Sequence, residues 1–439
     1  MPPVGVPASF WRGGTSRGLL FRAETLAPYP PTVRERIIRT ALGSPDPSGR
    51  QISGLGGGVS SLSKAAIVGV PGEGKELQEL YGALPGVSWA DDGERAGVGS
   101  WDVNYRFAQV GVRDLTIDWS ASCGNMFAAA ALSAITTPII PYSTLFARAR
   151  SLPRPNFDAP LMLPLSILSA SNGVLMRARV PVDPISLLPW EPKEGEGVEI
   201  AGVPGRDEPG IEVEMPLETG GGGAEAGLVT GRPRDVVKLE DGSEVTVSLL
   251  TSGLPNIFLP LSSLQRLPSY SFPASLLTLP ASDLTSDPIL PTLLESIRVA
   301  AAQQFSLPLS LASPKITLVG PVPDGGYSTT AGTRVEREDA DLLVRAVSSG
   351  DFHATIPGTT LGAVNLGLGT PGTVIHELAS PAATGEDDVV TVRAAHAAGV
   401  ASSSVRFSRG RAESVVMVRT AREIMRGEML VPERVLWEG

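Results

Sequence analysis

Two glycine- and serine-rich stretches decide how the chain folds: GGGVSSLSKAAI at residues 56–67 and SCGNMFAAAAL at residues 122–132. Each places small residues in front of an apolar run, a pattern that predicts the start of a helix. The first N–H groups of a helix have no partner within it, and they carry the positive end of its dipole, so they can hold a carboxylate. The two stretches place Lys64 and Cys123 beside these expected anion sites.

Lys64 and Cys123 are also unusual in the composition. Of the 36 basic residues, 31 are arginine, and the lysines are only those at positions 64, 75, 193, 238 and 315. Arginine stays charged in proteins, whereas a lysine can lose its proton when burial or a nearby cation lowers its pKa. Cys123 is the sole cysteine, which excludes an intramolecular disulfide. A lone cysteine is most often a small buried hydrophobe, but a thiol at a helix start ionises more easily, and we favour a proton-transfer role.

Length and charge limit the class of protein. A chain of 439 residues with 42% hydrophobic side chains predicts about two to three domains with substantial cores. The net charge of −10 argues against nucleic acid as a partner. The chain has no signal-like segment and no run of about 20 apolar residues, so we expect a cytoplasmic protein that binds no membrane.

Cofactor and metal motifs are incomplete. Residues 69–76, GVPGEGKE, follow a phosphate-binding loop until Glu76, which replaces the Ser or Thr that ligates magnesium. The glycines at 54–58 fail the dinucleotide fingerprint because Val59 stands in place of its last glycine. The histidines are too widely spaced for a metal site, although His353 is kept as a candidate site residue. We expect no cofactor and no metal.

Short apolar runs separated by glycine and proline predict an α+β architecture. Strands are expected at 9–11, 18–21, 105–110, 115–119, 245–247 and 316–319, and helices near 31–43, 60–67, 125–136, 287–304, 337–349 and 359–366. The segment 217–227, LETGGGGAEAG, predicts a flexible linker. We therefore expect an N-terminal domain at 1–235 and a C-terminal domain at 236–439, with the last strand or helix packing back on the first domain.

The two halves of the chain repeat one pattern. SKAAIVG at 63–69 matches SPKITLVG at 313–320, and a second helix start follows in each half, at Cys123 and at Thr359. A turn-like segment precedes each lysine, at 12–17 and at 251–256. Two related domains that face each other across a cleft would produce this repeat.

Together these motifs resemble those of the PrpF family of tricarboxylate Δ-isomerases. The resemblance is carried by RGGTSRG at 12–18, SKAAI at 63–67, DWSASCGN at 118–125, PKI at 314–316 and VRAAH at 392–396. It implies a diaminopimelate-epimerase-like fold of two pseudo-symmetric α+β domains, each a curved, mostly antiparallel sheet around a central helix. It further implies an active site in the cleft between the domains, where the residues at positions 64 and 123 transfer protons without a cofactor.

Members of this family move a C=C bond in methylaconitate, aconitate, methylitaconate or oxalomesaconate. Arg17 stands where bacterial relatives usually have lysine, and Pro/Gly-rich insertions lengthen the chain as in a fungal member. The resemblance therefore implies conversion of cis-aconitate to trans-aconitate by a 1,3-allylic proton shift, in the cytosol, for itaconate production. The alternatives are a 2-methylaconitate cis-trans isomerase, or another isomerase or tautomerase of an unsaturated di- or tricarboxylate.

In this reaction Lys64 is expected to be the general base and Cys123 the opposing acid, or the reverse, with Arg12 or Arg17 lowering the pKa of Lys64. The expected carboxylate binders are Arg12, Ser16, Arg17, Ser60, Ser61, Gly124, Asn125, Lys315 and Thr359, with Asn256 and His353 as further candidates. A two-thiol epimerase would need a second cysteine, and a pure tricarboxylate binder needs no ionisable pair. The sequence leaves the oligomeric state open, a homodimer included.

Overall fold

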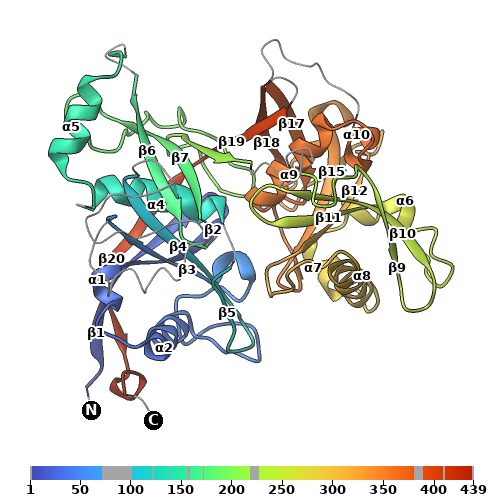
Figure 1. The fold of residues 1–439 in the computed structure, drawn as a ribbon, viewed down its shortest axis with the longest axis horizontal. Helices are drawn as coiled ribbons and strands as arrows, with labels where there is room; N and C mark the ends of the chain where they lie inside the picture. Colours follow the sequence, from blue (N-terminus) through green and yellow to red (C-terminus); the bar gives the residue numbers. More distant parts are fainter. Residues whose placement is uncertain are drawn as a thin grey trace. The chain divides into compact units, whose positions relative to one another are not determined.

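The computed structural model describes residues 2–71, 101–120, 123–137, 139–155, 159–171, 173–217, 227–379, 389–408 and 411–437. Most of the incomplete phosphate-binding motif at 69–76 and the interior of the expected linker, 218–226, lie outside these described residues. The chain forms two compact units: unit 1 comprises Met1–Glu214 with Val418–Gly439, and unit 2 comprises Met215–Met417. The C-terminal segment therefore belongs with the N-terminal half, and both termini lie at one end of unit 1 (Figure 1).

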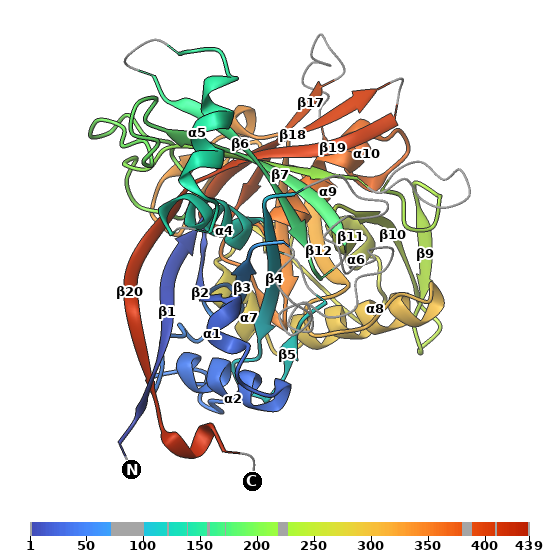
Figure 2. The same ribbon diagram turned by 60° about the vertical axis from the view of Figure 1, so that its left-hand side comes forward.

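Unit 1 is built on strands from both ends of the chain. These are β1 (Val4–Gly13), β2 (Ser16–Arg22), β3 (Lys64–Gly69), β4 (Val103–Val110), β5 (Ile117–Asp118), β6 (Leu161–Ser169), β7 (Val174–Val182), β8 (Ile211–Pro216) and β20 (Ala421–Val431). β1 pairs antiparallel with both β2 and β20, so the first and last strands of the chain lie side by side (Figure 2). β2–β3 and β4–β6 are parallel, whereas β3–β4, β4–β5, β6–β7 and β7–β8 are antiparallel.

Helix α4 (Gly124–Thr136) is the centre of unit 1. Residues 124–134 are all buried, and the helix contacts β1, β2, β3, β4, β7 and β20. A helix that is apolar on every side must be surrounded by other elements, and the run of alanines at 128–131 lets strands pack closely against it. The helix expected at 125–136 is therefore confirmed.

Shorter helices cover the rest of unit 1. They are α1 (Ala23–Leu26), α2 (Pro31–Leu42) and α5 (Tyr142–Arg150), with the 3₁₀ turns η1 (Ser60–Leu62) and η4 (Glu433–Val435). α2 buries Val33, Ile37, Ile38 and Leu42 in a core that also holds residues of β1, β2 and β3. In the described part of the chain, no helix has the length and apolar character needed to span a membrane.

Unit 2 repeats the strand order of unit 1. Its strands are β9 (Asp235–Lys238), β10 (Glu244–Thr251), β11 (Pro255–Pro260), β12 (Lys315–Gly320), β13 (Tyr327–Ser328), β14 (Arg334–Val335), β15 (Leu342–Ser348), β16 (Asp351–Phe352), β17 (Val389–His396), β18 (Gly399–Ser408) and β19 (Arg411–Arg419). The strand pairs of unit 2 match those among β1 to β7 one by one. The antiparallel pairs are β10–β11, β12–β15, β15–β16 and β17–β18, and the parallel pairs are β11–β12 and β15–β17. β9 pairs with β10 as β20 pairs with β1.

A second buried helix completes the repeat. α9 (Gly358–Gly369) is buried over residues 358–368 and contacts β10, β17 and β18. The other helices of unit 2 are α6 (Leu261–Leu264), α7 (Ala281–Ser286), α8 (Leu290–Gln304) and α10 (Val374–Leu378), with the turns η2 (Leu276–Thr278) and η3 (Arg337–Asp339). The expected fold class, α+β with two pseudo-symmetric units that each place a mostly antiparallel sheet around a central helix, is confirmed.

Two of the expected helices are wrong. Residues 60–67 form η1 and then β3, and residues 337–349 form η3 and then β15. All six residues of β3 are buried, as are six of the seven in β15, so neither strand shows the apolar–polar alternation of a half-exposed strand. Lys64 therefore begins a strand and does not lie at the start of an α-helix formed by its own segment.

Gly18 allows β2 and β3 to approach each other. It lies opposite Lys64 in the parallel pair, and a Cβ at position 18 would be 2.5 Å from the Lys64 carbonyl oxygen. An alanine there must push one strand away from the other. By contrast, a Cβ at Gly427 on β20 would meet no heavy atom within 4 Å.

We expect Gly18→Ala to lower the free energy of unfolding by about 1–3 kcal/mol, the usual cost of overpacking. Gly427→Ala, the matched control, should change it by less than about 0.5 kcal/mol. Urea denaturation measures both values, and equal effects of the two substitutions would contradict the close approach of β2 and β3.

Candidate active site

Cys123 occupies the N-cap position of α4, with extended backbone angles of φ −143° and ψ 103°. Its carbonyl accepts the first hydrogen bond of the helix from the Phe127 N–H at 2.9 Å, and its side chain makes no capping hydrogen bond. The N–H groups of the first turn and the helix dipole favour negative charge at this position. The helix start expected at Cys123 is confirmed.

A chain of hydrogen bonds leads from Arg419 to Cys123. Arg419 Nε donates to Asn125 Oδ1 at 3.0 Å, and Asn125 Nδ2 donates to Thr15 Oγ1 at 3.1 Å and to Ser16 Oγ at 3.3 Å. Ser16 Oγ lies 4.0 Å from Cys123 Sγ. Because Ser16 Oγ accepts a hydrogen bond from Asn125, its own hydrogen is free to point at the sulfur. The donors in this series of hydrogen bonds are therefore directed toward Cys123, which suits a thiolate there.

Arg419 is a buried cation at the end of β19. It is 6% exposed, and its Nη1 donates to the Val418 carbonyl at 2.8 Å. Burial lowers the pKa of Arg419 to about 10, and the charge of Cys123 opposes this change. The guanidinium stays charged near neutral pH and adds to the field at the start of α4. In the sequence, the sign of this role is an arginine that directly follows the apolar run VVMV at 415–418.

Lys64 is held by an amide. The residue is 6% exposed, and its Nζ donates to Gln109 Oε1 at 2.5 Å. Gln109 Nε2 donates in turn to the carbonyls of Ser60 and Ser63, at 3.0 and 3.1 Å. Nζ also lies 5.2 Å from the centre of the Phe107 ring. η1 and β4 thus position the Lys64 amine together, although the sequence pointed to neither Gln109 nor Phe107.

Burial lowers the pKa of Lys64, and the charge of Cys123 works against this shift. The expectation that Arg12 or Arg17 lowers it is wrong, because the cause is loss of water around the amine. Lys64 and Cys123 are therefore near enough for the charge of the cysteine to act on the amine. Both the amine–thiol state and the ammonium–thiolate state contain one proton donor and one proton acceptor.

Tyr105 supports Cys123 from β4. Its hydroxyl donates to the Cys123 carbonyl at 3.4 Å, and its ring packs edge-on against Phe127, with 5.8 Å between the ring centres. Burial raises the pKa of Tyr105 well above its usual range, so the hydroxyl remains a neutral donor. The start of α4 is thereby fixed to the sheet.

The other expected binders in unit 1 differ in what holds them. Arg12 Nη2 forms an ion pair with Glu208 at 2.8 Å, and its Nη1 donates to Thr420 Oγ1 at 2.8 Å. Arg17 packs over the Phe10 ring at 5.5 Å, and its buried Nε has no hydrogen-bond partner among the described residues. Ser60 and Ser61 form the turn η1, and Gly124 is buried in the first turn of α4. Arg12 is therefore already paired with a carboxylate, whereas Arg17 forms no ion pair within the described part of the chain.

Lys315, Thr359, Asn256 and His353 belong to unit 2. Lys315 begins β12 as Lys64 begins β3, and its Nζ donates to the Ala312 carbonyl at 3.1 Å. Asn256 lies opposite Lys315 in the parallel pair, and Thr359 is buried in the first turn of α9. His353 Nδ1 accepts a hydrogen bond from the Thr355 N–H at 3.2 Å. Across the described ranges, no group of three or more His, Cys, Asp or Glu side chains could hold a metal ion.

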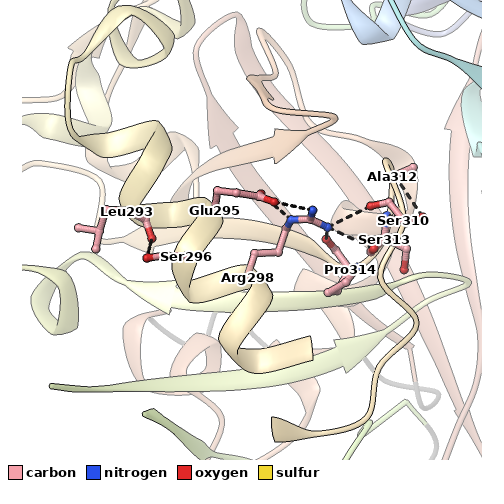
Figure 3. A network of polar contacts seen from close by, with 8 residues as sticks. All are labelled: Leu293, Glu295, Ser296, Arg298, Ser310, Ala312, Ser313 and Pro314. Atoms are coloured by element: carbon pink, nitrogen blue, oxygen red, sulfur yellow. Dashed lines mark hydrogen bonds and ion pairs between the residues drawn. The ribbon is translucent and has the colours of Figure 1, made fainter. Parts of the chain in front are cut away.

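Helix α8 holds the segment in front of Lys315. Arg298 Nη1 donates to the carbonyls of Ser310, Ser313 and Pro314 at 3.1, 3.2 and 3.3 Å (Figure 3). Glu295 binds the same guanidinium, with its Oε2 2.7 Å from Nε. This clamp fixes the backbone from which Lys315 projects.

We expect Arg419→Met to slow alkylation of Cys123 by iodoacetamide about tenfold near neutral pH, because a neighbouring cation favours the reactive thiolate. The intact mass reports the reaction directly, since the chain has one cysteine. Arg426→Met is the control, because Arg426 lies on β20 in an exposed pair with Glu423. Equal alkylation rates for both variants would show that Arg419 does not affect the reactivity of the Cys123 thiol.

Comparison with known proteins places this arrangement in a family. The chain matches the model of the family described as PrpF protein over residues 3–83 and 82–432. It is 28% identical over 446 residues to the 2-methyl-aconitate isomerase of Shewanella oneidensis, with 98% of each chain covered. It is 26% identical over 439 residues to the 3-methylitaconate isomerase of Eubacterium barkeri, again with 98% of each chain covered.

The fold agrees with a solved structure. The crystal structure of a methylitaconate-delta-isomerase matches with a TM-score of 0.63 at 25% identity, over 100% of this chain and 98% of the other. The family match includes the residues around Lys64 and Cys123 and extends through both units. The chain belongs to the PrpF protein family.

Proposed function

We propose that this protein moves the C=C bond of an unsaturated tricarboxylate by a 1,3-proton shift, with Lys64 and Cys123 as the proton-transfer pair and cis-aconitate as the substrate. That it is an isomerase follows from its PrpF family membership and its named relatives. One observation supports the mechanism: a buried lysine amine lies near a cysteine at a helix start, whose charge acts on it. The choice of aconitate rests on the resemblance noted at Arg17 and in the Pro/Gly-rich insertions.

The substrate dictates what the site must do. cis-Aconitate carries a CH₂ group next to its C=C bond, and loss of one methylene proton gives an allylic carbanion whose charge spreads onto the carboxylates. Protonation of the former vinyl carbon then completes the shift and yields trans-aconitate. One C–H bond breaks and one forms without a net gain or loss of electrons, so proton transfer and charge stabilisation account for the whole reaction.

Lys64 and Cys123 supply the two proton transfers. In the amine–thiol state, Lys64 removes the methylene proton and Cys123 protonates the vinyl carbon. In the ammonium–thiolate state the roles are exchanged. Lys64 is suited to the first role because its pKa is lowered by burial. Cys123 is suited to protonate the vinyl carbon because the field at the start of α4 stabilises the thiolate that remains. It is suited to act as the base because the Ser16 hydroxyl can donate a hydrogen bond to its thiolate.

The carbanion needs preorganised positive charge. N–H groups at the start of α4 and the guanidinium of Arg419 would meet the charge that develops on a substrate carboxylate. Arg17 is the better clamp for a second carboxylate, because Arg12 is paired with Glu208. Ser60, Ser61, Lys315, Thr359, Asn256 and His353 remain predicted substrate binders.

2-Methylaconitate is the alternative substrate, because one relative is named for it. It differs from aconitate by one methyl group, and an apolar pocket distinguishes such a pair by about 10- to 200-fold at most. Relative kcat/KM values therefore decide between the two acids. The cytosolic location, the part in itaconate production and a homodimer remain predictions from the sequence.

We expect proton NMR of the purified protein with a panel of acids to show conversion of cis-aconitate to trans-aconitate at a higher kcat/KM than that of 2-methylaconitate or methylitaconate. Turnover of 2-methylaconitate alone would replace the proposed substrate and keep the reaction. Absence of turnover for every acid in the panel would contradict the proposed function.

In the same assay, Lys64→Ala and Cys123→Ala should each lower kcat by about 10²- to 10⁴-fold, the usual contribution of a general acid or base. Thermal unfolding should show that both variants still fold. A variant that keeps a near wild-type kcat would exclude that residue from proton transfer.

A further inference from the structure

Gln109 lies at the centre of a row of three polar side chains across the sheet of unit 1. It is directly opposite Lys64 in the β3–β4 pair and directly opposite Asp118 in the β4–β5 pair. Side chains that are opposite each other on neighbouring strands project to the same face. Gln109 is 2% exposed and Asp118 is 7% exposed, so the row is buried along its length.

The contacts of Gln109 fix which way its amide faces. Both N–H groups are used, by the carbonyls of Ser60 and Ser63. The opposite orientation would place an oxygen against these two carbonyls, with no hydrogen bond to either. Oε1 must therefore be the atom that faces Lys64 Nζ.

An amide oxygen favours the charged state of a lysine less strongly than a carboxylate does. It accepts a hydrogen bond from an ammonium and from a neutral amine, whereas a carboxylate would favour the ammonium. A carboxylate is the next group in the row, at Asp118, where Oδ1 accepts hydrogen bonds from the Ser120 N–H and hydroxyl at 2.9 and 2.6 Å. Gln109 thus lies between the lysine and an acid that could pair with it.

We propose that Gln109 is a positioning residue that holds Lys64 Nζ and keeps it out of an ion pair with Asp118, so that Lys64 can exchange a proton with substrate. This inference rests on the proposed role of Lys64 in proton transfer. Gln109 contacts Lys64 Nζ and acts on the substrate only through that amine.

Unit 2 shows the same row without the amide. Ser348 lies opposite Asp351 in the β15–β16 pair, and the β12–β15 register, in which Ile316 faces Val347, places Ser348 next to Lys315. Lys315 Nζ instead donates to the Ala312 carbonyl. The glutamine is therefore found beside Lys64, the lysine proposed to transfer protons, and a serine occupies the corresponding position beside Lys315.

Other charged and titratable groups near β3 must be considered in any change of pH dependence. On the elements packed against it they are Arg17 and Arg22 on β2, Glu24 on α1, Tyr105 and Arg106 on β4 and Cys123 at the start of α4. Cys123 is the one among these whose charge acts on Lys64. A change at position 109 can therefore be read against a single coupled partner.

Carbamylation by cyanate tests the inference without turnover, because only a neutral amine reacts. Gln109→Glu supplies a direct carboxylate partner, and Gln109→Ser opens the row toward Asp118. Each should slow carbamylation of Lys64 about tenfold or more at a fixed pH, relative to Lys315 in the same sample, because an opposite charge favours the ammonium. Peptide mass spectrometry separates the sites, since the chain has only five lysines.

A rescue separates this role from a merely structural one. The double variant Gln109→Ser with Asp118→Asn lacks the competing carboxylate and should restore the carbamylation rate of Lys64. In the isomerisation assay, Gln109→Glu should move the pH profile of kcat/KM to higher pH. Gln304→Glu is the matched control, because Gln304 also bridges backbone groups, from Lys238 N–H to the Val236 carbonyl, but lies in unit 2. It should change neither reading.

Unchanged carbamylation of Lys64 in both single variants, or a loss that Asp118→Asn does not rescue, would overturn the inference. Failure of the proposed function would appear differently. Carbamylation of Lys64 would still respond to these substitutions, but the wild-type protein would isomerise no acid.

Discussion

Burial of one lysine amine at the start of β3 is the constraint on which the rest of unit 1 depends. Moving an ammonium from water into the protein interior costs free energy unless the charge is paired. This cost lowers the pKa of the amine, so that it loses its proton more readily. Unit 1 provides neutral hydrogen-bond partners instead of a carboxylate, through Gln109 and the carbonyls of η1 behind it. The close approach of β2 at Gly18 covers the lysine from the other side.

The repeated plan of the two units shows which parts are specialised. In both units a long strand begins with a lysine, and a buried helix follows further along the chain, but α4 has Cys123 at its N-cap and α9 has Pro357. A proline can neither give nor take a proton. The proposed chemistry therefore belongs to unit 1, where Arg419, Asn125 and Ser16 also meet Cys123.

Much of the fold could be predicted from local patterns. Strands with turn residues at their ends and the apolar helices at 125–136 and 359–366 were expected and are present. The helices expected at 60–67 and 337–349 failed, because strands buried on both faces lack the alternation that identifies them. The two-unit architecture itself came from the resemblance to a family, together with the repeat around Lys64 and Lys315.

The residues that tune the site could not be predicted, because their partners are far away in the sequence. Gln109 is 45 residues from Lys64, and Arg419 is 294 residues from Asn125. Only strand pairing brings them together, and a single sequence does not show that pairing. Lys64 and Cys123 could be singled out because lysine is scarce and cysteine unique in this chain.

The most direct test of the two-group proton shift is a single turnover of cis-aconitate in deuterated water, with the position of deuterium in the product read by NMR and mass spectrometry. Transfer by Lys64 and Cys123 as separate groups predicts trans-aconitate with close to one deuterium, located at the newly formed methylene carbon. Return of hydrogen through Lys64 alone would leave only part of the product labelled. Product without deuterium would contradict the account and favour rotation in a covalent adduct at Cys123.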